Sequence, residues 1–230
     1  MTILVTGANK GIGFETCRQL ARLKHNVILS ARSAQKGETA VKQLASDGLK
    51  VDFLLLDTAE EDSILRAARE LKQRIKSLNV LINNAAILDT WQGSIVTAKA
   101  FDLLSTFNTN VVGPVSLTLA LLPLLEAGKP ARVINVSSQL GSMEHMSDGW
   151  AGYGISKAAL NAATRKLAQA LKPRGISVLA ASPGWVRTDM GTSNAPLTVE
   201  QGAKNITRII TDMPATLTDH YLEERGEIPW

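Results

Sequence analysis

The chain has 230 residues, of which 45% are hydrophobic and 20% charged, and its net charge is +4. This length suits one domain with a sizeable core, and the composition excludes a disordered, collagen-like or membrane-bundle protein. The basic residues are interspersed with acidic ones, so we expect no nucleic-acid partner, and a single cysteine, Cys17, excludes a disulfide framework and a cysteine-based metal site.

Short apolar segments alternate with longer amphipathic segments along the chain. The apolar segments predict strands at residues 3–6, 26–31, 51–56, 80–83, 132–137 and 176–182, and near 218–222. The amphipathic segments predict helices at residues 11–23, 34–46, 63–76, 97–125, 151–171 and 198–210. This alternation, with nearly all-apolar strands, predicts a parallel sheet covered by helices on both faces. No linker or repeat interrupts it, so we expect residues 1–230 to form a single domain.

The N-terminal residues predict a strand at once rather than a targeting segment. No apolar run reaches about 18 residues without a polar break, so we expect no membrane partner. A cytoplasmic location is the expectation that follows.

A glycine-rich turn, TGANKGIG at residues 6–13, follows the first predicted strand. Glycine lets the backbone approach a ligand or a neighbouring strand, and the N–H groups that open the next helix favour a pyrophosphate. The spacing of Gly7, Gly11 and Gly13 is GxxxGxG rather than the usual GxGxxG. Its position between the first strand and the first helix nevertheless indicates a dinucleotide site. The alternative is a structural turn that binds no ligand.

Tyr153 and Lys157 are spaced i, i+4 on the helix predicted at 151–171, so they share one face. A Lys ammonium beside a phenol lowers the pKa of the phenol, which can then exchange a proton with a carbonyl or alcohol oxygen. Such a pair often arises by chance. Here it follows Ser137 and Ser138 at the carboxyl end of a predicted strand, where open α/β sheets bind ligands.

Three further motifs lie at the ends of predicted elements. Asn83-Asn84-Ala85-Ala86 ends the fourth strand, Asn110 lies midway in the helix predicted at 97–125, and Pro183-Gly184 follows the sixth strand. Gly113-Pro114 is expected to disturb the backbone hydrogen bonds of that helix. Singly, each Asn is more often a cap or turn residue, but the order of all the motifs together favours one functional site.

In this order the motifs resemble the short-chain dehydrogenase/reductase family, over nearly the whole chain. Within the family the chain is most similar to the carbonyl reductase branch, because of TGANKGIG at 6–13, PGWVRTDM at 183–190, VEQGA at 199–203 and a terminal IPW. The resemblance implies a doubly wound, Rossmann-like parallel sheet of about seven strands. It also implies a catalytic tetrad, formed here by Asn110, Ser138, Tyr153 and Lys157.

The resemblance implies a role for each member of the tetrad. Tyr153 would protonate the alkoxide that forms when hydride reaches a carbonyl carbon, while Ser138 holds the carbonyl oxygen. Lys157 would lower the pKa of Tyr153 and bind the ribose, and Asn110 would anchor a water that leads to solvent. Ser138 is chosen over Ser137 because the second serine matches the family pattern.

A set of cofactor-binding residues is predicted from the glycine-rich turn and the same resemblance. Its members are Gly7, Asn9, Lys10, Gly11, Ile12, Gly13, Arg32, Asp57, Thr58, Asn84, Ala85, Tyr153, Lys157, Pro183, Gly184, Val186 and Thr188. Asp57 and Thr58 would face the adenine, with a turn cap as the alternative for Asp57. Ala86 departs from the family, which usually has Gly there.

The second predicted strand ends in Ala31-Arg32-Ser33 without an acidic residue. An acidic residue there would accept hydrogen bonds from the ribose 2′-OH of NAD, whereas the planar fork of Arg32 suits a 2′-phosphate. Lys10 adds a second positive charge, so the sequence predicts NADPH. The alternative is that both are solvated surface charges.

The histidines and tryptophans are the remaining candidates for metal binding or substrate contact. His25, His145 and His220 lack metal-ligand spacing, so no metal is predicted. His145 and Trp150 lie in the loop 139–152 and either contact substrate or pack within the loop. Trp91 and Trp185 flank the expected cleft, with plain packing as the alternative. The loops 87–96, 139–152 and 188–196 would set specificity, so the sequence does not name the substrate.

The leading hypothesis is NADPH-dependent reduction of an aldehyde, ketone or quinone. The alternatives are an alcohol dehydrogenase that works oxidatively and a non-catalytic dinucleotide-binding regulator, against which the presence of both Tyr153 and Lys157 argues. The helices predicted at 97–125 and 151–171 pair across a two-fold axis in many family members. The second carries many small apolar residues, and the long insertion of monomeric carbonyl reductases is absent, so we expect a homodimer or homotetramer.

Overall fold

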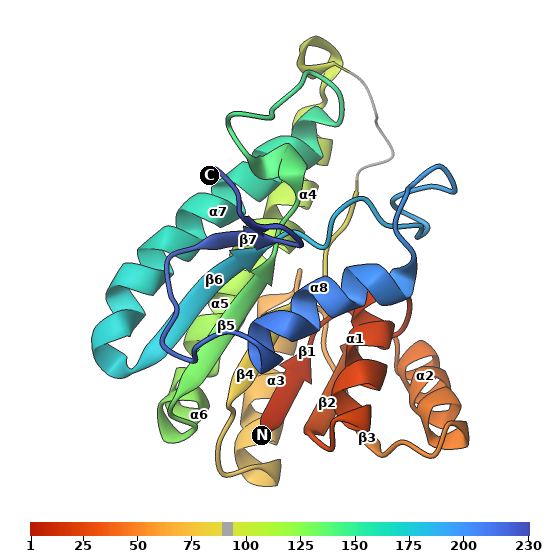
Figure 1. The fold of residues 1–230 in the computed structure, drawn as a ribbon, viewed down its shortest axis with the longest axis vertical. Helices are drawn as coiled ribbons and strands as arrows, with labels where there is room; N and C mark the ends of the chain where they lie inside the picture. The colour runs from red at the N-terminus through yellow and green to blue at the C-terminus, as the bar shows by residue number, and fades with distance from the viewer. Residues whose placement is uncertain (89–93) are drawn as a thin grey trace.

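The computed structural model describes residues 1–88 and 94–230 (Figure 1). Among these residues eight strands form one sheet, in the order β3-β2-β1-β4-β5-β6-β7-β8. The strands are β1 Thr2–Val5, β2 Asn26–Ala31, β3 Val51–Leu55, β4 Val80–Asn83, β5 Ala131–Val136, β6 Ile176–Ala181, β7 Tyr221–Glu223 and β8 Gly226–Glu227. Seven strands are parallel, and only the short β8 is antiparallel to its neighbour. The predicted doubly wound parallel sheet is confirmed, with β8 as one strand more than expected.

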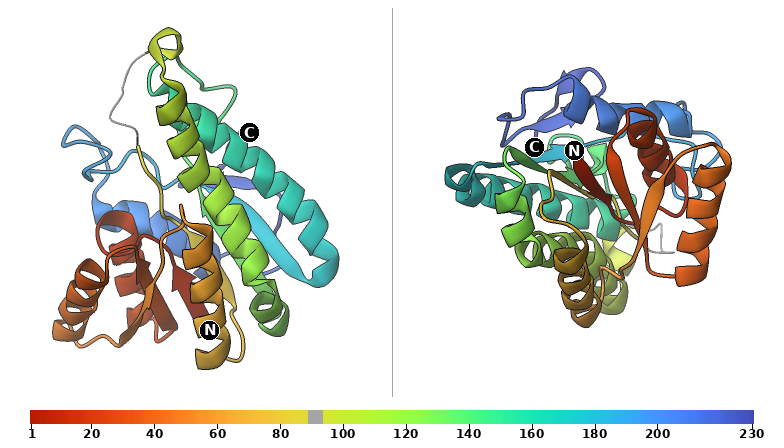
Figure 2. Two further views of the ribbon diagram at one scale, coloured as in Figure 1. Left: turned by 180° about the vertical axis from the view of Figure 1, so that it is seen from behind. Right: turned by 90° about the horizontal axis from the view of Figure 1, so that it is seen from below.

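Helices cover both faces of the sheet (Figure 2). They are α1 Gly11–Arg22, α2 Ala34–Ser46, α3 Glu61–Arg74, α4 Ala100–Phe107, α5 Gly113–Ala120, α6 Leu122–Ala127, α7 Ala151–Leu171 and α8 Val199–Thr211. One buried cluster joins the sheet to α1, α2 and α8, and the other joins it to α3, α5, α6 and α7. On β1, Ile3 and Val5 belong to the first cluster and Leu4 to the second, which is why the strand is apolar throughout.

The long helix expected at 97–125 is corrected by the structure. A π-helical turn, Asn108–Val112, separates α4 from α5, and Leu121 separates α5 from α6. Pro114 has no N–H to donate to the carbonyl of Asn110, so an α-helical hydrogen-bond pattern cannot run through this turn. The axis still continues, because the backbone at Asn108 and Gly113 stays right-handed helical.

The C-terminal tail also differs from expectation. The strand expected near 218–222 is β7 at Tyr221–Glu223, and β8 follows it after a short turn. Strands of two or three residues carry no readable periodicity, so their bounds follow from tertiary pairing with β6. The pairing lays the tail beside the carboxyl end of β6 (Figure 1).

Candidate active site

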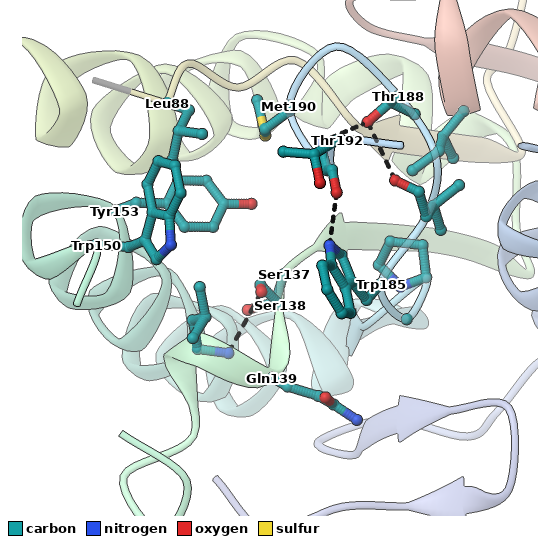
Figure 3. Close-up of a pocket in the computed structure, with 16 residues that line it drawn as sticks. Leu88, Ser137, Ser138, Gln139, Trp150, Tyr153, Trp185, Thr188, Met190 and Thr192 are labelled. Atoms are coloured by element: carbon teal, nitrogen blue, oxygen red, sulfur yellow. Dashed lines mark hydrogen bonds between the residues drawn. The ribbon is translucent and has the colours of Figure 1, made fainter. Parts of the chain in front are cut away.

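A pocket of about 380 Å³ lies at the carboxyl ends of the central strands, beside the start of α1 (Figure 3). Most of its lining is apolar or aromatic, with a few polar groups. The lining residues are Ile12, Leu88, Ser137, Ser138, Gln139, Leu140, Trp150, Tyr153, Pro183, Gly184, Trp185, Val186, Thr188, Met190, Gly191 and Thr192. An apolar cavity with few polar groups at this edge is the usual form of a small-molecule site in an open α/β fold.

The glycine-rich turn is shaped by two left-handed glycines and two close approaches. Gly7 has φ +61° and Gly11 has φ +58°, which side-chain-bearing residues rarely adopt. A Cβ on Gly7 would lie 2.8 Å from Cα of Ala85, and one on Gly13 would lie 2.5 Å from Nδ2 of Asn84. The turn is therefore pressed against the end of β4, and glycine is required at both positions.

Asn84 and Thr6 hold this turn in place. Nδ2 of Asn84 donates to the carbonyl oxygens of Thr6 (2.8 Å) and Gly7 (3.3 Å). Oγ1 of Thr6 accepts from the backbone N–H groups of Asn84 (3.0 Å) and Ala85 (2.9 Å). Asn84, which was predicted to bind cofactor, thus lies beside the expected cofactor path and supports the glycine-rich turn.

The start of α1 suits a pyrophosphate. The Lys10 side chain does not cap the helix, so the first-turn N–H groups face the glycine-rich turn without a side-chain acceptor from that residue. Asn9 is half-buried within the turn, and Ile12 lines the pocket. A helix N-terminus of this kind, opened by glycines with the required backbone angles, fits a dinucleotide phosphate.

Arg32 and Lys10 lie at the surface of this half. Arg32 is exposed at the end of β2. Nζ of Lys10 is 2.5 Å from Oδ2 of Asp189, and both side chains are mostly exposed. The charge that Lys10 could offer to a 2′-phosphate is therefore shared with the carboxylate of Asp189, in the loop after β6. The hydrogen bond from Lys10 holds the pKa of Asp189 below its usual range.

Asp57 and Thr58 follow β3 and pack against the π-helical turn. Oδ1 of Asp57 accepts from the N–H of Ala59 (3.0 Å), which is the turn cap that the sequence left open as an alternative. Thr58 is buried, and a Cβ on Gly113 would lie 2.3 Å from its carbonyl oxygen. Gly113 therefore lets the Asp57–Thr58 turn dock on the helix, and contact of these two residues with adenine stays a prediction.

The loop after β6 forms the wall of the pocket opposite Trp150. Gly184 has φ +82°, and Pro183, Val186 and Thr188 line the cavity with it. Nε1 of Trp185 donates to the carbonyl of Gly191 (2.6 Å), which closes the loop on itself (Figure 3). The predicted cofactor residues of this loop are thus brought to the pocket, on the far side from α7.

The four predicted catalytic residues come from three segments: Ser138 and Tyr153 line the pocket, whereas Asn110 and Lys157 are not among its described lining residues. Ser138 follows β5, Tyr153 and Lys157 lie on α7, and Asn110 lies in the π-helical turn. Figure 3 shows the Tyr153 hydroxyl pointing into the pocket, and Ser138 lines the same pocket. Ser137 lines the pocket as well, so the choice of Ser138 stays a prediction.

Lys157 is buried and donates from Nζ to the carbonyl of Val136 (2.7 Å), with Nζ 5.4 Å from the Tyr153 ring centre. Burial lowers the pKa of Lys157 to about 7. Burial also raises the pKa of Tyr153 well above its usual value, and the Ser138 side chain opposes this only in part. The sequence predicts a lowered pKa for Tyr153 from the neighbouring Lys157, whereas desolvation of the phenol raises it in the structure.

Asn110 is fully buried and joins three segments. Its Nδ2 donates to the carbonyl of Ile87 (2.9 Å) and to Oγ of Ser156 (3.0 Å), and its Oδ1 accepts from the N–H of Ile87 (2.9 Å). Ser156 precedes Lys157 on α7, so Asn110 connects the segment after β4 to α7. Its suggested role in anchoring a water stays a prediction.

The aromatic candidates separate in the structure. Trp150 and Trp185 both line the pocket, whereas His145 is exposed and is not among the lining residues described. Trp91 lies outside the described residues. Leu88, Met190 and Thr192 were not singled out individually, although the loops that hold them were expected to set specificity.

The sequence reasoning missed Tyr221. Its hydroxyl donates to the carbonyl of Ser138 from β7, the strand expected near residues 218–222, for which the sequence indicated no functional role. The chain has only two tyrosines, and that count was the one signal that could have drawn attention to it.

Within residues 1–88 and 94–230, no helix is long and apolar enough to cross a membrane. In the same part of the chain, no three His, Cys, Asp or Glu side chains come together as a metal would need.

Residues 1–197 match the family model described as short chain dehydrogenase. The chain belongs to the short-chain dehydrogenase family. A short-chain dehydrogenase of Penicillium roqueforti, anuI, is 35% identical over 224 residues, covering 91% of this chain and 88% of that protein. Carbonyl reductase (NADPH) 1 of Sus scrofa is 35% identical over 246 residues, covering 87% of this chain and 83% of that protein.

Solved structures give the same result for the fold. The carbonyl reductase Sniffer of D. melanogaster superposes with a TM-score of 0.91 at 31% identity, covering 100% of this chain and 99% of that one. An NADPH-bound carbonyl reductase from chicken fatty liver gives 0.90 at 30% identity, covering 100% and 98%. The family and the oxidoreductase class predicted from the motifs are therefore confirmed.

Proposed function

We propose that the chain reduces an aldehyde, ketone or quinone to the alcohol with NADPH, and that residues 1–230 act as one cofactor-binding and catalytic domain. The observation that carries this is the Tyr153 hydroxyl, which points into an apolar pocket with Ser138 beside it and the glycine-rich turn alongside. The NADPH named for the carbonyl reductases from Sus scrofa and chicken fatty liver supports the choice of cofactor.

The residues present fit a dinucleotide. The glycine-rich turn and the uncapped start of α1 would hold the pyrophosphate, and Arg32 with Lys10 would hold the 2′-phosphate. Lys157 would reach the ribose. When bound, the nicotinamide supplies the hydride, and the protein supplies orientation and charge.

Tyr153 acts as the general acid in this proposal. Burial raises its pKa, so the phenol carries its proton at neutral pH and can give it to a carbonyl oxygen. Ser138 donates a hydrogen bond to the same oxygen and stabilises the charge that develops there. A Lys157 pKa of about 7 allows that side chain to take up and release protons near neutral pH.

Oxidation of an alcohol is the alternative direction. It requires Tyr153 to accept a proton, and the raised pKa of the protonated phenol favours the reducing direction instead. A non-catalytic regulator needs only the glycine-rich turn. The presence of Ser138 and Tyr153 together in the pocket wall, with Lys157 Nζ 5.4 Å from the Tyr153 ring centre, favours an enzyme.

The test is NADPH consumption with a panel of aldehydes, ketones and quinones, for the wild type and Tyr153→Phe. We expect Tyr153→Phe to keep cofactor binding and thermal stability and to lose about 10²–10⁴-fold in kcat, because it removes only the transferable proton. Cofactor binding is followed by NADPH fluorescence. Near-normal turnover by Tyr153→Phe would contradict the assigned mechanism.

We also propose that the chain assembles as a homodimer or homotetramer through α4, α5 and α7. Phe101 and Leu104 on α4 are 79% and 70% exposed, and Leu119 and Ile155 are exposed on α5 and α7. Exposed apolar side chains gathered on adjoining helices are typical of a contact surface. Light scattering at micromolar concentration tests this, and a monomeric mass would refute it.

A further inference from the structure

Tyr221 is the second of the chain's two tyrosines, and it lies behind Ser138 rather than in the pocket. Its side chain is fully buried, and its hydroxyl donates to the carbonyl of Ser138. The same carbonyl accepts from the N–H of Gly141 (2.7 Å). Both lone-pair directions of this carbonyl are therefore occupied, and its orientation is fixed from two sides.

The Tyr221 ring is held by the last residue of the chain. Trp230 stacks on it with ring centres 5.6 Å apart, and the Arg165 guanidinium lies 5.4 Å from the Trp230 ring centre. The carbonyl of Trp230 accepts from the N–H of Met143 (3.0 Å). The C-terminal tail thus contacts both ends of the segment 138–143, which carries Ser138.

Glu223, two residues further along β7, adds a polar link. Its two carboxylate oxygens accept from Nε2 of Gln139 (2.8 Å) and from Oγ of Ser182 (2.9 Å). Gln139 directly follows Ser138, and Ser182 directly follows β6. The tail therefore couples the Ser138 segment to the neighbouring strand as well as to Tyr221.

The Ser138 carbonyl is the one hydrogen-bond partner of the Tyr221 hydroxyl among the described residues. Oγ of Ser137 and Oδ1 of Asn161 are buried nearby without a hydrogen-bond partner in the same part of the chain. Burial raises the pKa of Tyr221 to about 12, so the hydroxyl keeps its proton at neutral pH. A single proton directed at the Ser138 carbonyl makes this a directional contact.

We propose that Tyr221, braced by Trp230, is a positioning residue that fixes the Ser138 backbone so that Oγ of Ser138 meets both Tyr153 and the substrate oxygen. This rests on the reaction proposed above. Ser138 must strengthen its hydrogen bond as charge develops on that oxygen, so a small misplacement lowers kcat while ground-state binding changes little.

The test compares Tyr221→Phe with a matched control, Ser177→Ala. Both remove a buried hydroxyl from the same sheet, and Oγ of Ser177 bonds only backbone carbonyls of Ala131 and Ala215. We expect Tyr221→Phe to lower kcat roughly 5–30-fold with the carbonyl KM within about twofold, because one hydrogen bond and its alignment are lost. Ser177→Ala should keep kcat within about twofold, at a similar melting temperature to Tyr221→Phe.

A second pair of variants tests the brace. Trp230→Phe keeps an aromatic stack and should keep kcat within about twofold. Trp230→Ala should lower kcat as Tyr221→Phe does, although both tyrosines remain. Equal kcat values for Trp230→Phe and Trp230→Ala would overturn the role given to the stack.

A spectroscopic readout makes the test independent of turnover. Protein labelled with carbon-13 at tyrosine Cζ gives two signals, and in Tyr221→Phe the remaining one belongs to Tyr153. We expect this signal to move in Tyr221→Phe and to stay in Ser177→Ala. An unmoved Tyr153 signal, a kcat for Tyr221→Phe within twofold of wild type, or an equal kcat loss in Ser177→Ala each overturns the proposal. A wild type that reduces no carbonyl would instead sink the proposed function, while the Tyr153 signal still reports on positioning.

Discussion

The nucleotide side and the catalytic side of this molecule are built differently. The nucleotide side consists of backbone: glycines with left-handed angles, an uncapped helix start and a turn pressed against β4. The catalytic side consists of polar side chains from distant segments, of which Asn110, Tyr153, Lys157 and Tyr221 are buried and Ser138 is half-buried. The first is local in sequence, whereas the second exists only after the sheet has formed.

The two sides therefore differ in how much folding free energy they cost. The charges of the nucleotide side, on Lys10 and Arg32, stay at the surface, where they disturb folding little. The catalytic side buries an amine and two phenols, which water would otherwise solvate. We therefore expect the buried polar groups of the catalytic side to lower the stability of the fold. We expect the nucleotide side to depend on the close packing of its glycine-rich turn.

The largest expected effect concerns Lys157→Met. The pKa of Lys157 falls from 10.5 to about 7 on folding, so between these values the unfolded state holds a proton that the native state lacks. Stability therefore rises with pH across that window, and the full penalty, about 3–5 kcal/mol at most, applies below it. Lys157→Met removes the penalty, so its stability relative to wild type should be greater near pH 6 than near pH 10.

Urea unfolding at both pH values measures this difference. Lys157→Met also loses the bond to the Val136 carbonyl, but that loss does not vary with pH. Lys166→Met, an exposed lysine on the same helix, is the control and should show no such pH dependence. If the difference in unfolding free energy between Lys157→Met and the wild type is the same at both pH values, the buried amine does not destabilise the fold.

The next effect tests shape on the nucleotide side. Gly7 and Gly48 both have positive φ, but a Cβ on Gly7 would meet Ala85 whereas one on Gly48 would meet nothing within 4 Å. Gly48→Ala should cost about 1 kcal/mol from backbone strain, and Gly7→Ala about 2–3 kcal/mol with weaker NADPH binding, because overlap adds to strain. Urea unfolding and NADPH titration measure these effects. Equal losses of unfolding free energy in the two variants would show that the close approach of Gly7 to Ala85 contributes nothing.

This contrast also explains what the sequence could predict. The glycine-rich turn and the helix at 151–171 were predicted with their bounds, because glycine spacing and helical periodicity are local signals. The disturbance of the helix at Gly113-Pro114 was predicted from the proline, but its form, a π-helical turn at Asn108–Val112 that also brings Asn110 to Ile87, was not. Tyr221 was missed because a three-residue strand acquires its register only by pairing with β6.

Cofactor preference gives a smaller effect on the nucleotide side. A hydrogen bond from a charged group contributes roughly 1.5–3 kcal/mol, so contact of Arg32 with a 2′-phosphate predicts about a 10–100-fold preference for NADPH over NADH. Arg32→Asp should erase or invert it, since the donor is lost and the carboxylate repels the phosphate. Lys10→Ala should change it less, because Lys10 already pairs with Asp189. The measurement is kcat/KM with each cofactor, and equal use of NADH by the wild type would show that Arg32 was misread.

The smallest effect concerns Trp150, which lines the pocket from the residue before α7 with φ +59° and ψ +38°. A left-handed backbone costs a side-chain-bearing residue about 1 kcal/mol, whereas glycine adopts it without strain. Because backbone strain is often retained at functional sites, we predict that the indole contacts the substrate. Trp150→Ala and Trp150→Gly both remove the wall, so both should raise KM for an aromatic carbonyl about tenfold and leave a small aliphatic aldehyde unaffected. Only Trp150→Gly also relieves the backbone strain, so its free energy of unfolding in urea should be about 1 kcal/mol higher than that of Trp150→Ala. An equal KM change for both substrates would place Trp150 among packing residues, and equal stability of the two variants would show that its backbone stores no strain.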